Sequence, residues 1–256
     1  MDYGALIDMA VLAGQIMLDS GAEVYRIEDT VKRILEQSGL ESTEVFVLAT
    51  GIFATLSDPA SGAVTVVKRV SRHSTNLNRI CGVNDVSRRF CAGDMTVEEA
   101  QEELKRIAGA AEYEPPYKYV GYVMTSAFFA VLFGGGTLDC LAAGTIGFIL
   151  ALVVSAASRL RLNDFCQNAS GSFALALTAL LIRQIFFYGM NLDAVIISAI
   201  MPMVPGVTFT AAIRDTLNGD YSSGVARMAE AVVVALAVAV GVGAAMVGFR
   251  LIGGAV

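Results

Sequence analysis

Five long apolar runs in the second half of the chain constrain its fold more than any other feature. They cover about 119–136, 138–158, 169–187, 194–213 and 229–249. A transmembrane helix needs about 20 mostly apolar residues to cross a hydrocarbon layer of ~30 Å. The 256-residue chain is 55% hydrophobic, with a mean hydropathy of +0.62, which is more apolar than a soluble domain requires. The sequence therefore predicts a membrane domain of five transmembrane helices.

Charge is distributed unevenly along the chain. Residues 1–118 contain 12 Lys and Arg and 18 Asp and Glu, a net charge of −6, whereas the remaining residues contain six of each sign. Charged side chains at the bilayer centre are costly, so this contrast marks a boundary between water and lipid. We expect a cytosolic domain at 1–114, a linker at 115–118 that begins with Pro115 and Pro116, and a transmembrane domain at 119–256.

The basic residues of the connections predict the orientation of the membrane domain. Arg159 and Arg161 lie between the second and third runs, and Arg214 and Arg227 lie between the fourth and fifth. The other two connections, about 134–138 and 188–193, contain no Lys or Arg. Because cytoplasmic connections are enriched in Lys and Arg, the N-terminus is expected in the cytoplasm and the C-terminus outside.

The stretch MPMVPG at 201–206 lies near the centre of the fourth run. Proline lacks a backbone N–H and disrupts a helix interior, so this span is predicted to be broken. Backbone groups freed at membrane depth are tolerated only against protein or a water-filled cavity. Transporters use such broken helices to bind polar solutes. A proline kink satisfied by neighbouring helices is the alternative interpretation.

The residues around the break are the candidate substrate site. Arg214 and Asp215 would match an anionic or zwitterionic solute, although a salt bridge at the membrane interface is the alternative. The third run opens with small polar residues that either line a cavity or pack closely. The complete candidate set comprises Pro202, Pro205, Gly206, Thr208, Thr210, Arg214, Asp215, Asn168 and Ser170.

Ala237, Gly241 and Ala245 in the last run have the small-xxx-small spacing that lets two helices approach closely. We expect a packing face there. The pattern leaves open whether the neighbouring helix belongs to this chain or to another.

The first domain is predicted to be α+β. Residues 5–18 are too short and too polar to cross a membrane and predict a buried helix. A second helix is expected from a capping box at Ser20 and Glu23 to Gly39, followed by two or three antiparallel strands between residues 43 and 71. Two more helices are expected at 75–91 and 97–111, the latter capped by Thr96 and Glu99. The fold class is an α-helical membrane domain, five transmembrane helices with the fourth broken, plus this N-terminal α+β domain.

A ligand site in the first domain is a second possibility. Glu23, Arg26 and Glu28 are candidates for acid–base chemistry, and Thr50, Asn76 and Asn78 are polar residues near strand ends. The alternative interpretation is a helix cap, solvated helix charges and ordinary loop polarity. The single histidine, His73, and four cysteines without a CxxC pair predict no metal or other cofactor. The acidic domain also argues against nucleic-acid binding.

Three stretches resemble the threonine/serine exporter family. They are SGAEVYRIEDTVKRI at 20–34, AVTVVKRVSRHSTNLNRICGVNDVSRR at 63–89 and MVPGVTFTAAIRDTLNGDYSSGVAR at 203–227. The resemblance covers nearly the whole chain, and its most specific part comprises Pro205, Gly206, Ala212, Asp215, Gly224 and Arg227. In particular, the chain resembles the long subunit of the split form of the family.

The resemblance implies a secondary exporter in a bacterial or archaeal cell membrane. Its substrate would be a small amino acid such as threonine or serine, or a small carboxylate such as succinate. It also implies a second, small membrane subunit of the same family, beside which homo-oligomerisation remains open. A hydrolase or ligand sensor that acts through the cytosolic domain, with the spans as an anchor, is the alternative function.

Overall fold

The computed structural model describes residues 2–40, 42–58, 62–70, 74–110, 115–186 and 189–253. The chain forms two compact units, each assembled from two separated stretches. The first contains Met1–Glu112 and Val207–Ala229, and the second contains Tyr113–Gly206 and Glu230–Val256. The first unit thus includes a stretch well beyond the boundary expected near 114–118. His73 lies outside the described residues.

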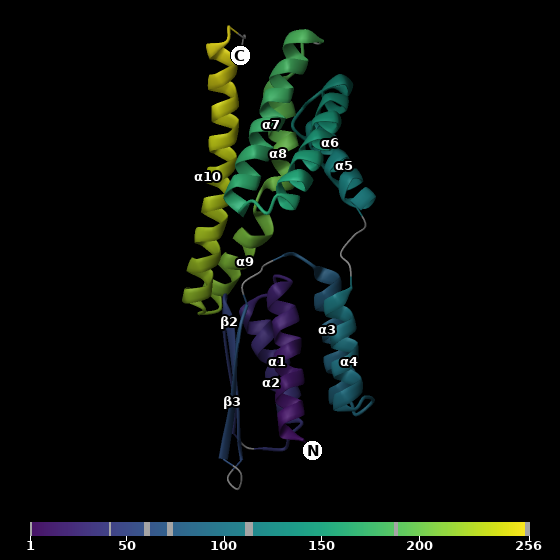
Figure 1. Cartoon of the computed structure of the whole chain (residues 1–256), viewed down its shortest axis with the longest axis vertical. Helices are drawn as coiled ribbons and strands as arrows, with labels where there is room; N and C mark the ends of the chain where they lie inside the picture. Colours follow the sequence, from purple (N-terminus) through teal and green to yellow (C-terminus); the bar gives the residue numbers. More distant parts are fainter. Residues whose placement is uncertain are drawn as a thin grey trace. The chain divides into compact units, whose positions relative to one another are not determined.

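The first unit contains an antiparallel sheet and two pairs of helices. Strands β1 (Ser42–Leu48), β2 (Gly51–Asp58) and β3 (Gly62–Arg69) pair in the order β1-β2-β3. Helices α1 (Tyr3–Asp19) and α2 (Val24–Glu36) cover one face of the sheet. Helices α3 (Leu77–Cys91) and α4 (Val97–Gly109) pack on the other side of α1 and α2 (Figure 1). The predicted α+β character of this region is confirmed.

Helix α1 is the centre of this first core. Its buried residues, among them Leu6, Met9, Met17 and Leu18, face several directions around the helix. A helix that is apolar all round needs neighbours on every side, and the sheet, α2 and the α3–α4 pair provide them. The prediction that residues 5–18 form a buried helix is therefore confirmed.

The predicted capping box at Ser20 and Glu23 is wrong. Ser20 is the C-cap of α1, and α2 begins only at Val24, after a turn in which Gly21 has a φ of +82°. Glu23 occupies the N-cap of α2 but forms no side-chain cap hydrogen bond. The second predicted box is confirmed, since Thr96 and Glu99 exchange bonds of 2.8 and 3.2 Å at the start of α4.

Helix α9 (Gly206–Leu217) and the beginning of α10 (Tyr221–Leu251) complete the first unit. Arg227 was expected in the connection between the fourth and fifth spans. Helix α10 starts before the expected fifth span at 229–249, so Arg227 lies in the part of this helix that precedes that span. The turn between α9 and α10 passes through Gly219, whose φ is +97°.

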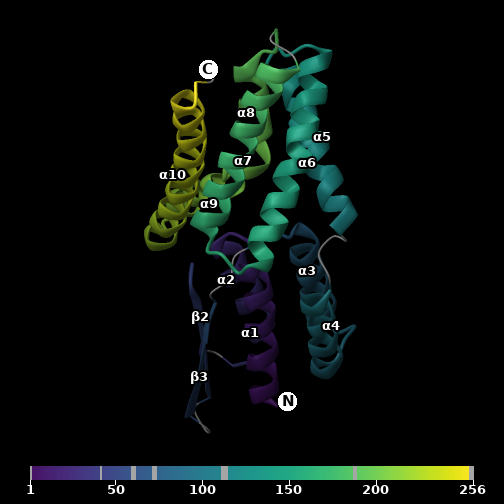
Figure 2. The same ribbon diagram turned by 45° about the horizontal axis from the view of Figure 1, so that its top comes forward.

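The second unit is a helical bundle. It contains α5 (Pro115–Leu132), α6 (Thr137–Arg159), α7 (Asp164–Ile185), α8 (Leu192–Ile200), a 3₁₀ turn (Met201–Met203) and the rest of α10 (Figure 2). Among the described residues, α6, α7 and α10 are each long and apolar enough to cross a membrane, and α8 with α9 would make a fourth, broken span. The chain is thus a multi-pass membrane protein. The fifth predicted span, α5, begins with the polar turn Pro115 to Lys118 and does not meet this criterion, so the five-helix count stays a prediction.

The predicted break in the fourth run is present. Helix α8 ends at Ile200, the 3₁₀ turn contains Pro202, and Val204 is extended before α9 starts at Gly206. Gly171 of α7 faces this turn, because a Cβ at Gly171 would lie 3.2 Å from the methyl carbon of Met203.

The small-residue face of α10 packs against α7 of this same chain. A Cβ added at Gly241 would lie 2.1 Å from Ser172 Oγ and 2.3 Å from the carbonyl oxygen of Ala169. Ala237 and Ala245, one helical turn away on either side, are fully buried. The expected packing face is confirmed, and its neighbour is identified as the start of α7.

Candidate functional site

An open groove of about 490 Å³ lies beside the helix break in the second unit. It is lined by Tyr117, Lys118, Gly121, Tyr122, Thr125 and Pro202. Five of these residues come from the first turns of α5, and Pro202 comes from the 3₁₀ turn. Pro202 of the proline break thus lines this open groove. Interrupted backbone at membrane depth is tolerated only against protein or a water-filled cavity.

The spacing of the polar residues on α5 explains why they share this groove. Lys118, Tyr122 and Thr125 follow one another at i, i+4 and i+7, which places them on one face of a helix. They present an ammonium group and two hydroxyl groups, and Lys118 also takes part in an interaction within the chain. Such groups match a small solute that carries a carboxylate and further hydrogen-bonding groups.

Most of the predicted site residues of the second unit do not line this groove. Pro202 does, whereas Pro205 is half-buried and Gly206 is exposed. Asn168 and Ser170 bond to the backbone of their own helix, with Nδ2 2.8 Å from the Asp164 oxygen and Oγ 3.1 Å from the Gln167 oxygen. Both lie in the segment of α7 that packs against α10.

Lys118, Tyr122 and Thr125 were not predicted as site residues from the sequence. A signal for them was present, since a lone cation and two hydroxyl groups recur at helical spacing at the start of an apolar run. Their relation to Pro202 depends on the packing of α5 against the 3₁₀ turn, 80 residues away in the sequence.

The first unit contains a second arrangement, which we call the hairpin clamp: Asp215 of α9 and Arg227 of α10 with the backbone of Ala22 and Val24. The Asp215 side chain is fully buried, and its Oδ2 lies 3.1 Å from Nη1 of Arg227. The Val24 N–H donates to Oδ1 of Asp215 over 3.2 Å. Arg227 in turn donates from Nη2 to the Ala22 carbonyl over 2.7 Å.

Two small residues allow α9 and α10 to meet so closely. A Cβ at Gly224 would lie 2.2 Å from Thr216 Oγ1 and 3.0 Å from the carbonyl oxygen of Ala212, which is itself fully buried. Four of the residues that carry the family resemblance, Ala212, Asp215, Gly224 and Arg227, therefore build one structural element. Their spacing reflects the packing of a helical hairpin.

Arg214 forms a separate, more exposed contact beside the clamp. Its guanidinium pairs with the carboxylate of Glu23, which also lies 3.5 Å from Arg26. Burial raises the pKa of Glu23, but hydrogen bonds from its own backbone N–H and from Arg214, with the charges of Arg26 and Arg214, lower the pKa below its usual value overall. Glu23 is thus a stable carboxylate held between two arginines.

Glu28 has the opposite electrostatic setting. Burial raises its pKa, the hydrogen bond of 2.9 Å from the Val47 N–H lowers it, and the negative charge of Asp220 raises it again, so that the pKa lies above its usual value. Glu28 therefore helps to fix the end of β1 at an electrostatic cost.

The remaining candidates of the first unit have local structural roles or stand exposed. Asn76 is the N-cap of α3 and accepts from the Arg79 N–H over 3.1 Å. Thr50 and Asn78 are exposed. On α9, Thr208 is half-buried and Thr210 bonds to the Val207 carbonyl over 3.0 Å.

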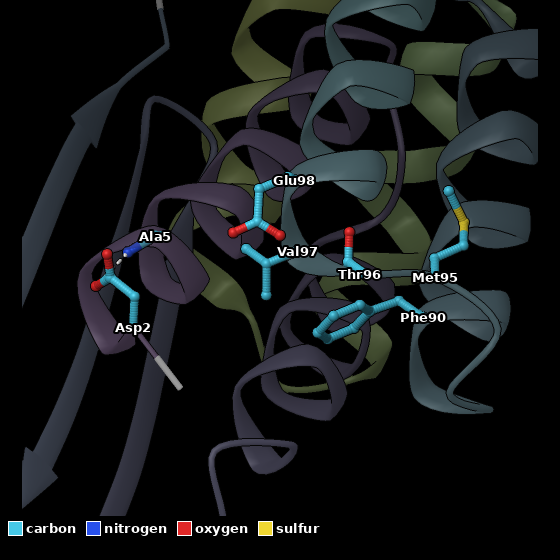
Figure 3. Close-up of a pocket in the computed structure, with 7 residues that line it drawn as sticks. All are labelled: Asp2, Ala5, Phe90, Met95, Thr96, Val97 and Glu98. Carbon is cyan, nitrogen blue, oxygen red and sulfur yellow. Dashed lines mark hydrogen bonds between the residues drawn. The ribbon is translucent and has the colours of Figure 1, made fainter.

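A further hollow of about 310 Å³ in the first unit is explained by helix capping. It lies between the start of α1 and the α3–α4 connection and is lined by Asp2, Ala5, Phe90, Met95, Thr96, Val97 and Glu98 (Figure 3). Asp2 caps α1 and Thr96 caps α4. In the part of the chain that the structure describes, no group of three or more His, Cys, Asp or Glu side chains is placed to hold a metal ion.

Comparison with known proteins gives a consistent family match. A family model described as "Putative threonine/serine exporter" matches residues 8–248. The "Probable threonine/serine exporter" of Mycobacterium tuberculosis is 21% identical over 244 residues, which cover 93% of this chain and 45% of that protein. The "Threonine/serine exporter" of Corynebacterium glutamicum is 25% identical over 244 residues, with 93% and 50% coverage. The chain spans about half the length of these relatives. No solved structure gives a significant match.

Proposed function

Because the chain belongs to the threonine/serine exporter family, we propose that it is part of a secondary exporter that moves small amino acids out of the cell. The groove beside the helix break, lined by α5 and Pro202, is the solute site of this proposal. That groove is the observation on which the proposal rests, because it combines an interrupted helix with a cation and hydroxyl groups.

The chemistry of the groove fits the proposed substrate class. The ammonium of Lys118 attracts a carboxylate, which threonine, serine and small dicarboxylates share. The hydroxyl groups of Tyr122 and Thr125 offer donors and acceptors to a hydroxyl or amino group of the solute. Interrupted backbone at the 3₁₀ turn supplies further hydrogen-bonding groups, as in other transporters with discontinuous helices. Succinate belongs to the same proposal as an alternative cargo.

We further propose that a second membrane half completes the pathway. The resemblance assigns this half to a separate small subunit of the same family, and the relatives are about twice as long as the matched region. With five spans and a cytoplasmic N-terminus, this unit would end outside, and a homologous partner would therefore run inverted. Inverted repeats build the central site of many secondary transporters.

Paired threonine substitutions test the proposed site. Thr125→Val removes one hydroxyl from the groove, whereas Thr145→Val removes an exposed hydroxyl of α6 that donates to the Leu141 carbonyl, 2.8 Å away. In cells that produce the chain with its second membrane half, Thr125→Val should slow threonine and serine efflux about tenfold, the loss expected for one buried hydrogen bond of ~1.4 kcal/mol. Thr145→Val should leave efflux unchanged.

If both valine variants slow efflux equally, or if neither slows it, the groove is not the solute site. If no amino acid or dicarboxylate leaves the cells faster with the wild-type chain than without it, the proposed exporter function is wrong. That result would favour the alternative of a membrane-anchored hydrolase or sensor.

A further inference from the structure

The first unit has a groove between α2 and α3 that neither the hairpin clamp nor the proposed transport site uses. It encloses about 440 Å³ and is lined by Tyr25, Arg26, Asp29, Thr30 and Arg33 of α2 and by Asn84, Ser87, Arg88 and Cys91 of α3. We call it the arginine groove. We propose that the arginine groove binds a soluble small molecule that carries a diphosphate group.

The charge of the groove is opposite to that of its surroundings. Three arginines and one aspartate give it a net charge of +2, whereas residues 1–118 together carry −6. A concave surface with an excess of one sign of charge focuses its potential and concentrates ions of the opposite sign. An acidic domain that gathers three guanidinium groups in one hollow is therefore suited to an anion.

The arginines retain donors for a ligand. Arg33 donates from Nε to Asp29 over 3.0 Å, and its two terminal amino groups form no hydrogen bond to another described residue. Arg26 reaches Glu23 with Nη1 alone, over 3.5 Å. Within the described residues, Arg88 forms no ion pair. Guanidinium groups bind phosphate oxygens in a bidentate manner, so these donors fit phosphate better than a simple halide.

The size of the groove favours two linked phosphates over one. Arg26 and Arg33 are seven residues apart on α2, a rise of about 10 Å along the helix, and Arg88 faces them from α3. Its volume falls within the range of about 300–1,000 Å³ that is typical of small-molecule sites. Tyr25 adds an aromatic ring at the rim, on which a nucleoside base would stack.

Neighbouring arginines on α3 provide a matched pair of variants. Arg88 lines the groove, whereas Arg89 does not and pairs with Asp85 over 3.7 Å. Arg88→Gln and Arg89→Gln change the net charge equally, and both side chains are exposed. The experiment measures equilibrium binding of radiolabelled pyrophosphate, and separately of ADP, to the purified full chain at constant ionic strength.

We expect Arg88→Gln to weaken pyrophosphate binding about tenfold or more, since a hydrogen bond to a charged group contributes ~1.5–3 kcal/mol. Arg89→Gln should bind like the wild type, and Arg88→Lys should recover part of the affinity. Tighter binding of ADP than of pyrophosphate would identify a nucleotide as the occupant and support the proposal. Equal losses in both glutamine variants would show a nonspecific charge effect and overturn it.

A thiol readout checks the location of binding independently. Cys91 lines the groove, and its Sγ lies 3.6 Å from the Arg33 carbonyl. In a chain whose other cysteines, Cys81, Cys140 and Cys166, are replaced by serine, pyrophosphate should slow alkylation of Cys91. Unchanged alkylation at saturating pyrophosphate would overturn the proposal. Protection by short-chain phosphatidylglycerol but not by pyrophosphate would also overturn it, in favour of a lipid headgroup. Neither measurement involves transport, so failure here leaves the exporter proposal untouched.

Discussion

Asp215 and Arg227 form a buried ion pair, and each side chain also forms a hydrogen bond to the backbone. Their side chains are 0% and 9% exposed, and they bond the peptide groups of Ala22 and Val24. A buried ion pair is only weak evidence for net stability, but removal of one partner leaves an uncompensated charge in a buried site. The hairpin clamp is therefore sensitive to a single substitution.

The clamp predicts that substitutions of two arginines of the same helical hairpin differ strongly in their effect on stability. Arg227→Gln should destabilise the protein by about 3–5 kcal/mol, because Asp215 and the Ala22 carbonyl lose their partner. Arg214→Gln should cost less than about 1 kcal/mol, since the Arg214 side chain is 58% exposed. Thermal unfolding of the full chain in detergent compares the two. Equal stabilities would show that the clamp contributes nothing specific.

Replacement of Glu28 by glutamine should stabilise the protein in a pH-dependent manner. Its pKa is raised in the folded state by burial and by Asp220, so ionisation of Glu28 destabilises the fold as pH rises through that pKa. Glu28→Gln keeps an acceptor for the Val47 N–H and removes the charge. The variant should be more stable than the wild type at pH 7, by less than about 1 kcal/mol, and no more stable near pH 4.

The exposed residue Glu102 of α4 is the control for this comparison. Unfolding midpoints of Glu28→Gln and Glu102→Gln should differ at pH 7 and converge in acid. A gain for Glu28→Gln that is the same at both pH values would mean that ionisation is not its cause.

Among the helices, α10 contains glycines that differ in how closely a neighbouring helix approaches them. A Cβ at Gly241 would collide with Ser172 and Ala169, whereas a Cβ at Gly243 would meet nothing within 4 Å. Gly241 is therefore a point of close approach between α7 and α10, and Gly243 is not. The small polar residues at the start of α7 serve this contact, and they also bond to their own helix.

Two alanine variants test this crossing. Gly241→Ala should destabilise the protein by about 1–3 kcal/mol, because α7 and α10 must separate. Gly243→Ala should be neutral or slightly stabilising, since alanine favours a helix over glycine by up to about 1 kcal/mol. Thermal unfolding in detergent measures both. A Gly241→Ala protein as stable as the wild type would contradict the close contact.

Local sequence patterns predicted several helices and strands. The features that these patterns did not predict depend on contacts between residues far apart in the sequence. Periodicity and turn residues predicted the helices and strands of the first unit, the Thr96 cap and the break at 201–206. The false cap at Ser20 shows the limit, because the chain needs those residues for a turn before α2. The hairpin clamp joins residues 191 and 205 positions apart, partly through backbone atoms, which no local pattern reports.

The candidate transport site was likewise predictable only in part from local sequence signals. Pro202 was predicted from the break, since two prolines and a glycine within an apolar run are a strong local signal. The i, i+4, i+7 stripe of α5 was also readable from the sequence, but only packing assigns it to the same groove as Pro202. Asn168 and Ser170 are small polar residues of the kind that can line a cavity, but they lie where α10 approaches α7.

For the whole molecule, family membership and the break at 201–206 together support the proposed transport function. The family match extends over residues 8–248 and so includes both compact units. We propose that alternating access arises from movement of this membrane half against an inverted partner, with the interrupted backbone next to the solute. Restoring a continuous helix should therefore slow transport strongly while the protein still folds.

The most direct measurement is threonine counterflow in proteoliposomes that contain this chain with its second membrane half. Preloaded liposomes should accumulate labelled threonine, and a Pro202→Ala, Pro205→Ala double variant of normal thermal stability should reduce the rate about tenfold or more, the equivalent of ~1.4 kcal/mol at the limiting step. Labelled succinate in parallel liposomes distinguishes the two cargo classes. Counterflow that persists at the wild-type rate in the well-folded double variant would contradict the role of the break, and the absence of counterflow for every amino acid and dicarboxylate tested would contradict the exporter itself.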